Sequence, residues 1–321
     1  MPPGSRYERC RPARRVSDAV PIEVYDTGAE LPRALAPPVP SLLFRLGMVL
    51  VAASLLLMLF GPSITPFDVG RPTDQIDSPP PALAAMPGLL WQVISNAPHA
   101  PIHWFGTDSA GLDIFSRVIA APRTDVAIAV GANLVSLLAG SLLGLLAGTV
   151  RGWPGGLLMR LSDLVQAFPV FITGMILVTL AGRTNWTIVL TLALLYTPIY
   201  VRLTRSEVLA QQRRGFVDAA RALGRSEAEI ALRHVLPNAL APALIQASVT
   251  VGFAILMTAG LSFVGAGVRP PTPEWGLMIA AGADAIAEGE WWPSVFPGLA
   301  ISVTVFGYAA FGNGLERLHA S

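Results

Sequence analysis

The sequence contains no lysine, and this absence limits the chemistry that the chain can carry. A Walker A loop needs a lysine after its glycines to hold nucleotide phosphates, so the chain does not contain that ATP-binding loop. The one cysteine, Cys10, excludes internal disulfides and zinc sites built from several cysteines. Charged residues make up only 13% of the chain, whereas soluble domains carry about 25%. A chain that is 53% hydrophobic and so poor in charge is expected to be a polytopic membrane protein.

Six apolar stretches are long enough to cross a bilayer as helices. They cover residues 42–60, 124–150, 157–181, 186–203, 240–264 and 293–313. We therefore expect an all-α fold with six transmembrane helices. The expected order is a largely disordered tail (1–40), a first transmembrane helix (41–60), an extracytoplasmic loop (61–123), a five-helix core (124–314) and a short cytoplasmic tail (315–321). Within the second span, four glycines predict close helix contacts, at Gly131, Gly140, Gly144 and Gly148.

The arginines predict the orientation of these spans. With the N-terminus in the cytoplasm, seventeen of the 22 arginines fall on the cytoplasmic side and five outside. The positive-inside rule favours this arrangement, in which both termini are cytoplasmic. Five arginines also crowd the start of the tail, where they could contact anionic membrane lipid: Arg6, Arg9, Arg11, Arg14 and Arg15.

The longest charged, helix-favouring segment is a hairpin, residues 212–238, between the fourth and fifth spans. Phe216, Ala220 and Leu223 have helical spacing, and Gly224 suits a helix end because glycine adopts positive φ without strain. Ser226 and Glu229 then have the spacing of a capping box. The pattern predicts two short amphipathic helices with a glycine bend, which lie on the membrane surface and offer an apolar face to a partner.

This hairpin resembles the EAA loop of ABC-importer permeases, which docks on the ATPase subunit. The resemblance rests on Asp218-Ala219-Ala220, on Gly224, and on Leu236-Pro237. Asp218 stands where the family usually has glutamate. Aspartate keeps the negative charge but has a shorter side chain. The resemblance implies a set of ATPase-coupling residues: Asp218, Ala219, Ala220, Leu223, Gly224, Ile230, His234, Leu236 and Pro237. In particular, we expect Leu223 and Ile230 to fill a groove in the ATPase. The alternative is an ordinary interfacial helix with no partner.

Two further segments resemble C-type permeases of the oligopeptide/dipeptide–nickel branch. Residues 103–117 resemble the GTD-x-x-GRD segment before the second span, with Leu112 in place of the usual arginine; the matching residues are Gly106, Thr107, Asp108, Gly111 and Asp113. Residues 261–279, LSFVGAGVRPPTPEWGLMI, resemble the signature after the fifth span. The ending GNGLER is close to the family's GDGLRD, but Asn313 replaces the aspartate.

The resemblance implies a permease subunit of an ATP-driven peptide importer in a bacterial inner membrane. Its implied partners are a B-type permease, two ABC ATPase subunits and an extracytoplasmic substrate-binding protein. We expect this chain to have no catalytic residues, to hold no cofactor and to bind no nucleic acid. His99 and His103 could suggest a metal site, but Pro101 between them interrupts the helix that would align them, so none is expected.

Two other classes of protein remain open at this stage. A secondary transporter or channel often carries ionisable groups at the membrane midplane, whereas the charges in these spans lie near the span ends, at Arg45, Asp163 and Arg202. For Asp163 a role at the interface or in helix packing competes with a transport role. A membrane enzyme is the other class, but no HExxH or GxSxG motif is present. Dipeptides, longer peptides, nickel chelates and glutathione are all open as cargo.

Overall fold

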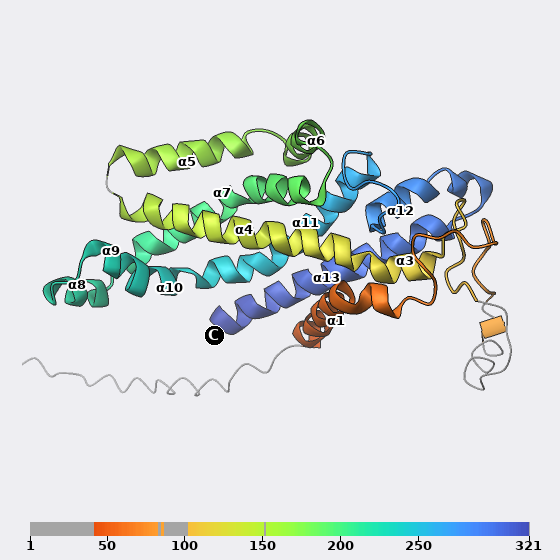
Figure 1. Cartoon of the computed structure of the whole chain (residues 1–321). Helices are drawn as coiled ribbons and strands as arrows, with labels where there is room; N and C mark the ends of the chain where they lie inside the picture. The colour runs from red at the N-terminus through yellow and green to blue at the C-terminus, as the bar shows by residue number, and fades with distance from the viewer. Residues whose placement is uncertain (1–41, 83–84, 87–101, 151, 321) are drawn as a thin grey trace, which may run out of the picture. The chain divides into compact units, whose positions relative to one another are not determined.

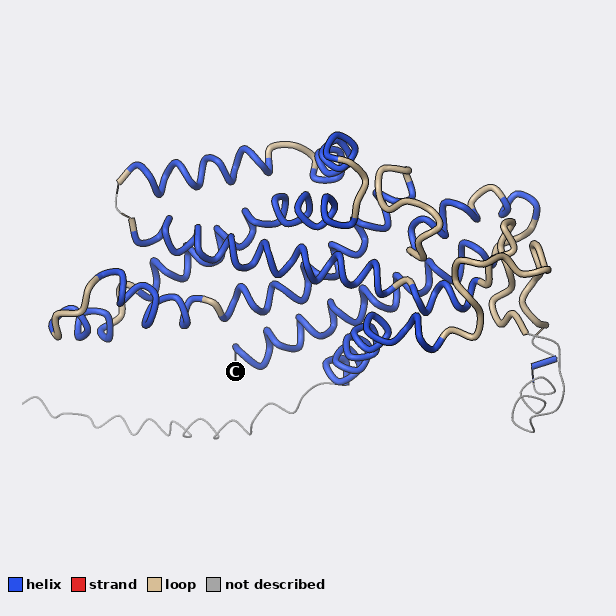
Figure 2. Tube along the Cα trace, viewed as in Figure 1, coloured by secondary structure: helices blue, strands red, loops and turns tan. Residues whose placement is uncertain are grey.

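The computed structural model describes residues 42–82, 85–86, 102–150 and 152–320, so the predicted tail, Cys10 and His99 lie outside the described residues. The described part is built from helices and loops, as Figure 2 shows. The main helices are α1 (Leu42–Ile64), α3 (Ile114–Ala120), α4 (Pro122–Thr149), α5 (Trp153–Gln166), α6 (Val170–Ala181), α7 (Asn185–Gln211), α11 (Ala241–Phe263), α12 (Trp275–Gly282) and α13 (Trp292–Ala320). Short helical segments make up the hairpin: α8 (Gly215–Ala222), α9 (Glu227–Ile230), η2 (Ala231–Val235) and α10 (Leu236–Ala239).

Five spans are long and apolar enough to cross a membrane by themselves, and α5 with α6 makes a sixth if this bent pair counts as one span. The all-α fold is therefore confirmed, with five to six candidate spans. The predicted third span, 157–181, is not one straight helix, because α5 and α6 meet at 87°. Pro169 explains the break: it has no N–H to donate, and it disfavours helical geometry at Phe168 before it.

Several boundaries differ from the predicted ones. Helical structure begins at Ile114, inside the predicted loop 61–123, because the Asp113 side chain accepts the Ser116 N–H and caps α3. The fourth span continues through the polar residues up to Gln211, so α7 extends beyond its apolar stretch. Helix α13 continues to Ala320, which includes most of the predicted tail 315–321.

The glycines of α4 set its packing against α7. A Cβ atom on Gly140 would lie 2.5 Å from Tyr200 Cβ, one on Gly144 would lie 2.8 Å from Thr204 Cβ, and one on Gly148 would lie 2.6 Å from a Val208 methyl. Only glycine allows this approach, as small-residue contacts between membrane helices predict. Gly131 makes no such close approach: its nearest neighbour is a Val189 methyl at 3.7 Å.

This register also gives the direction of the helices. Residue numbers rise together along the α4–α7 contact, so the two helices run parallel. The segment that connects them in the sequence, α5 with α6, must therefore bring the chain back to the end at which α4 began. Numbers run oppositely where α11 meets α13, since Gly252 lies against Tyr308 and Gly312 against Ser248. They also run oppositely where α1 meets α13, since Gly307 lies against Leu50 and Gly314 against Phe44. The last turn of α13 therefore lies toward the hairpin end, and α3 and α12 lie toward the other end (Figure 1).

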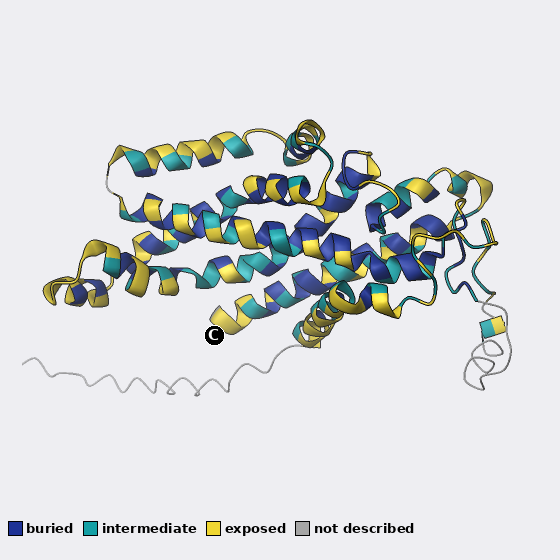
Figure 3. Ribbon diagram, in the orientation of Figure 1, coloured by how far each residue is buried: buried dark blue, intermediate teal, exposed yellow. Residues whose placement is uncertain are grey.

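The buried core lies between α4, α7 and α11. Its fully buried members include Val126, Ile188, Leu192, Ile255 and Leu261. Figure 3 shows exposed residues along α1 and α5 on the outside of this core. The exposed residues of α1 are mostly apolar, and only 11% of its most apolar window is buried. Such a surface is stable against lipid tails rather than water.

Candidate functional site

The hairpin closes at Gly224 as the sequence predicts. Gly224 has φ +77°, and an added Cβ would meet nothing within 4 Å, so glycine is needed there for its backbone angle rather than for space. The Gly224 N–H donates to the Arg221 carbonyl at 2.9 Å, and the Arg225 N–H donates to the Ala220 carbonyl at 3.2 Å. These two bonds form a Schellman motif, which satisfies the last carbonyls of α8.

The second half of the hairpin starts at Ser226, whose hydroxyl accepts the Glu229 N–H at 3.2 Å. The Glu229 carboxylate bonds to Arg225 and Arg233 at the surface. The two arginines lower the pKa of Glu229, with Arg225 as the larger influence. A π-helical turn, η2, follows: Pro237 has no N–H to continue the regular pattern, and the Leu236 N–H donates to Ala231, five residues back.

One face of the hairpin is buried against this chain's own helices. Val217, Ile230 and Val235 have at most 2% exposure, and they belong to one cluster with Leu145 of α4 and Val208 of α7. The cluster fixes the hairpin to the ends of two spans. The expectation that Ile230 fills a groove in a partner is wrong for this structure, because the side chain is already packed. Helical spacing identified an apolar face but could not say which surface would cover it.

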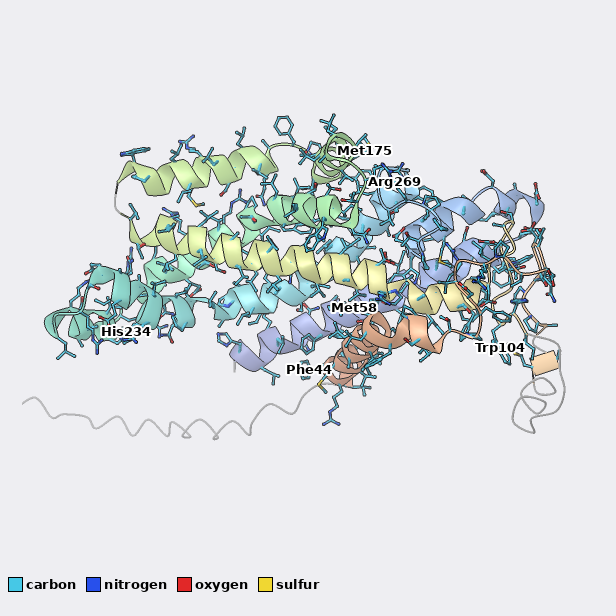
Figure 4. The ribbon with its side chains drawn as sticks, in the orientation of Figure 1. Phe44, Met58, Trp104, Met175, His234 and Arg269 are labelled. Atoms are coloured by element: carbon cyan, nitrogen blue, oxygen red, sulfur yellow. The ribbon has the colours of Figure 1, made fainter. Side chains whose placement is uncertain are left out.

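The opposite face carries exposed apolar side chains. Leu223 is 82% exposed at the tip of the bend, Leu232 is 55% exposed and Phe216 is 38% exposed. Of the other residues that the EAA resemblance singles out, Asp218, Ala219 and Pro237 are exposed, His234 and Leu236 are half-buried, and Ala220 is buried. His234 lies at the hairpin end of the molecule, away from Trp104 (Figure 4).

Arg221 joins the two arms of the hairpin. Its guanidinium donates to Asp218 at 3.2 Å within α8, and to Glu227 at 2.7 Å across the bend. These acidic partners raise the pKa of Arg221, with Glu227 as the larger influence. The ion pairs are exposed, so they orient the arms more than they stabilise the fold.

The GTD segment forms a second site at the other end of the helices. Gly106 and Gly111 have φ +78° and +74°, which only glycine adopts without strain. Asp108 accepts the N–H groups of Ala110 and Leu112, at 3.0 and 2.8 Å. Burial raises the pKa of Asp108, and the Leu112 N–H opposes this rise. Leu112 donates through its backbone, so the leucine at this position still makes the turn.

The same segment fastens distant parts of the chain together. Thr107 exchanges two hydrogen bonds with Ser78, each 2.9 Å long. The Thr107 carbonyl accepts the indole N–H of Trp292 at 3.0 Å. Asp113 caps α3 and lies 2.8 Å from His103 Nδ1. The five motif residues thus lie close together. Their hydrogen bonds are made with other residues of this chain, so the structure shows a structural role for them.

Sequence reasoning missed two contacts between ionisable side chains. Arg202 donates to Asp163 at 2.8 Å, which joins α7 to α5. Asp125 and Glu274 are both fully buried and lie against one another. The partners of the two pairs lie 39 and 149 positions apart in the sequence, so no local spacing signals the pairing. Among the residues that the structure describes, no three histidine, cysteine, aspartate or glutamate side chains cluster as metal ligands would.

Comparison with known proteins places the chain in a family. Residues 140–318 match the family model for the binding-protein-dependent transport system inner membrane component. A probable D,D-dipeptide transport system permease protein of Escherichia coli K12 is 34% identical over 270 residues, which is 84% of each chain. The dipeptide transport system permease protein of Alkalihalophilus pseudofirmus is 31% identical over 84% of this chain and 83% of its own. A glutathione transport system permease protein of Escherichia coli O6:K15:H31 is 38% identical over 70% and 73% of the two chains.

A solved structure shares the fold. A chain from the inward-facing MetNI methionine ABC transporter aligns with a TM-score of 0.50 and 17% identity, over 64% of this chain and 95% of that one. The family match decides against a secondary transporter, a channel and a membrane enzyme. The chain therefore belongs to the binding-protein-dependent transport system inner membrane components, and it is a permease subunit of an ABC transport system.

Proposed function

We propose that this permease is the C-type subunit of a peptide importer, and that its hairpin couples the membrane helices to separate ATPase subunits. Binding-protein-dependent systems have ATPase and binding-protein partners in general. The specific assembly proposed here is this chain, a B-type permease, two ATPase subunits and an extracytoplasmic binding protein. ATP is hydrolysed outside this chain, which needs no cofactor of its own.

The observation that carries the proposal is the two-sided hairpin. One side is packed into a cluster with Leu145 and Val208, at the ends of α4 and α7. The other side presents Leu223, which is 82% exposed, on a bend that Gly224 fixes. A force applied at Leu223 would therefore reach two spans through packed side chains. Such a link suits rigid-body movement of spans when the ATPase subunits close.

The orientation is part of the proposal. The hairpin and the end of α13 lie toward one end of the helices (Figure 1), and the start of α1 packs beside the end of α13, with Phe44 against Gly314. Most of the arginines that the structure describes belong to the segments at this end. The positive-inside rule then puts this end, with both termini, in the cytoplasm, where an ATPase would meet the hairpin. The six-span count treats the bent α5–α6 pair as one crossing.

Peptides are the proposed cargo because relatives that cover most of the chain are named for dipeptide and glutathione transport. Glutathione is itself a tripeptide, so these names share short peptides as a chemical class. Deleting the gene should abolish uptake of a labelled dipeptide, and a plasmid copy should restore it. Unchanged dipeptide uptake in the deletion strain would contradict the cargo assignment, and labelled glutathione would be tested next.

The coupling role is tested by Leu223→Ser, with Ile286→Ser as the matched control. Both side chains are exposed and apolar, but Ile286 lies in η3 (Ala285–Glu288), after α12 and far along the chain from the hairpin. We expect Leu223→Ser to reduce co-purification of the ATPase and to reduce uptake by at least about tenfold, which corresponds to about 1.4 kcal/mol of lost contact. The control should transport normally. Normal transport and assembly in Leu223→Ser would refute the coupling role.

A further inference from the structure

Asp125 and Glu274 form a buried acidic pair that the transport mechanism above does not use. Asp125 lies in the first turn of α4 and is 1% exposed; Glu274 lies just before α12 and is 0% exposed. The Trp275 N–H donates to Asp125 at 3.1 Å, and Glu274 is the residue before Trp275, so the two carboxyl groups are close neighbours. Two ionised carboxylates in such a place would repel each other strongly, since the low dielectric of the interior weakens screening.

Among the described residues, no arginine is paired with Asp125 or Glu274. Asp125 and Glu274 are each other's charged neighbour in the described part of the chain. Arg117 directs its guanidinium to the carbonyls of Val69 and Pro271. Arg183 donates to the carbonyls of Gly267 and Val268, and Arg123 and Arg269 are exposed. The charge must therefore be removed in another way, and a bound proton is the simplest one.

The hydrogen bonds show which carboxyl is the acceptor. Glu274 accepts the Gly276 N–H at 3.0 Å with one oxygen and the Leu277 N–H at 2.6 Å with the other. The Ser262 hydroxyl also lowers the pKa of Glu274. Donors on both oxygens favour the ionised form. Glu274 thus caps α12 as a carboxylate.

Asp125 has the opposite environment. Its Oδ2 accepts the Trp275 N–H at 3.1 Å. Its Oδ1 is buried and meets no N–H or O–H donor among the described residues. A buried oxygen without a donor is costly, unless that oxygen carries a proton of its own and donates it.

We propose that Asp125 is a neutral carboxylic acid in the folded protein and donates its proton to the Glu274 carboxylate. The hydrogen bond made by this proton then links the start of α4 to the start of α12. The contact joins residues 149 positions apart in the sequence. It lies at the end of the helices opposite the hairpin (Figure 1).

The proton makes the junction sensitive to alkali. Burial raises the pKa of Glu274, although its backbone donors oppose the rise. The pair as a whole therefore binds a proton more tightly in the folded protein than in the unfolded chain. Stability from this proton is fully present below the unfolded-state pKa values of the two acids, and it is lost as pH rises through the folded-state pKa of the pair.

Infrared spectroscopy of the purified full chain tests the proposal directly. A neutral carboxylic acid has a carbonyl band that a carboxylate lacks. We expect this band to be present at neutral pH, to shift when aspartate is labelled with carbon-13 in its side-chain carboxyl, and to stay in place when glutamate is so labelled. A band that shifts only with labelled glutamate would reverse the assignment. The absence of any such band would overturn the proposal.

Two isosteric variants separate the proton from packing. Asp125→Asn keeps an acceptor for the Trp275 N–H and supplies a permanent donor to Glu274, so it should fold, lose the infrared band and lose the alkaline fall in melting temperature. Glu274→Gln turns an amide NH2 toward the Gly276 or Leu277 N–H and should lower the melting temperature at every pH. An alkaline fall that is the same in Asp125→Asn and in the native chain would count against the proposal. The native-chain spectra decide the matter if either variant fails to fold.

Discussion

Gly144 of α4 lies directly against Thr204 of α7, so closely that a methyl group on the glycine would come within 2.8 Å of Thr204 Cβ and of the Val201 carbonyl oxygen. We expect Gly144→Ala to lower the free energy of unfolding by about 1–3 kcal/mol, because the helices would have to separate. The measurement is the melting temperature of the purified protein in detergent.

Gly156→Ala is the control for this prediction. Gly156 lies in α5, where an added Cβ meets nothing within 4 Å. Alanine there should be neutral or stabilising by up to about 1 kcal/mol, because alanine favours helix. Equal melting temperatures for the two variants would mean that the α4–α7 contact tolerates extra volume.

Gly224→Ala tests the bend of the hairpin separately from its contacts. An added Cβ would have open space, but φ +77° is strained for alanine and should cost about 1–2 kcal/mol. Gly215→Ala, at the start of α8, also has open space but has no positive φ; it should stabilise by about 0.4–1 kcal/mol. Protease sensitivity of the hairpin in intact membranes measures both. If Gly224→Ala resisted protease as well as Gly215→Ala did, the bend would not depend on glycine.

Trp292→Phe tests the hydrogen bonds that hold the GTD segment in place. The variant keeps most of the buried ring but removes the indole N–H that donates to Thr107 at 3.0 Å. Loss of this buried hydrogen bond should cost about 1 kcal/mol, seen as a lower melting temperature. Trp291→Phe, at a ring that is 47% exposed, should change little. A larger effect at Trp291 than at Trp292 would mean that the Trp292–Thr107 bond does not hold this end of the helices together.

A double-mutant cycle tests the pair of Asp163 and Arg202. Asp163→Asn and Arg202→Gln should each reduce stability, because either change leaves one charge without its partner at 2.8 Å. The double variant should be more stable than the two separate losses predict, with a coupling energy of up to about 1 kcal/mol, since both side chains are about half exposed. A coupling energy of zero would mean that the pair contributes only to surface charge.

Local signals predicted local structure well. The positive φ of Gly224 and the cap at Ser226 follow from residue type and spacing over a few positions, and both are present. The close contacts of Gly140, Gly144 and Gly148 follow from small residues at every fourth position. The break at Pro169 had a signal in the sequence, but the long apolar run around it favoured a single straight span.

The sequence could not show which surface covers each apolar helix face. The same apolar spacing that marks Ile230 as buried would mark it as a docking residue, and only the packing with Leu145 and Val208 decides between them. The pair of Asp125 and Glu274 depends on a fold that brings together two segments far apart in sequence. The coupling role of the hairpin residues and the functional role of the GTD segment remain predictions for the experiments above.

The parallel arrangement of α4 and α7 has an electrostatic consequence at the hairpin. Each α-helix carries about half a negative charge at its C-terminal end, and parallel neighbours place these partial charges side by side. Arg205 neutralises part of the negative charge at the end of α4, because its Nε donates to the Ala147 carbonyl in the last turn of that helix at 3.3 Å. Arg213 and Arg214 follow the end of α7 and are exposed. Part of the basic charge at this end thus balances the field of the membrane helices themselves, and only the remainder is left to attract an acidic surface.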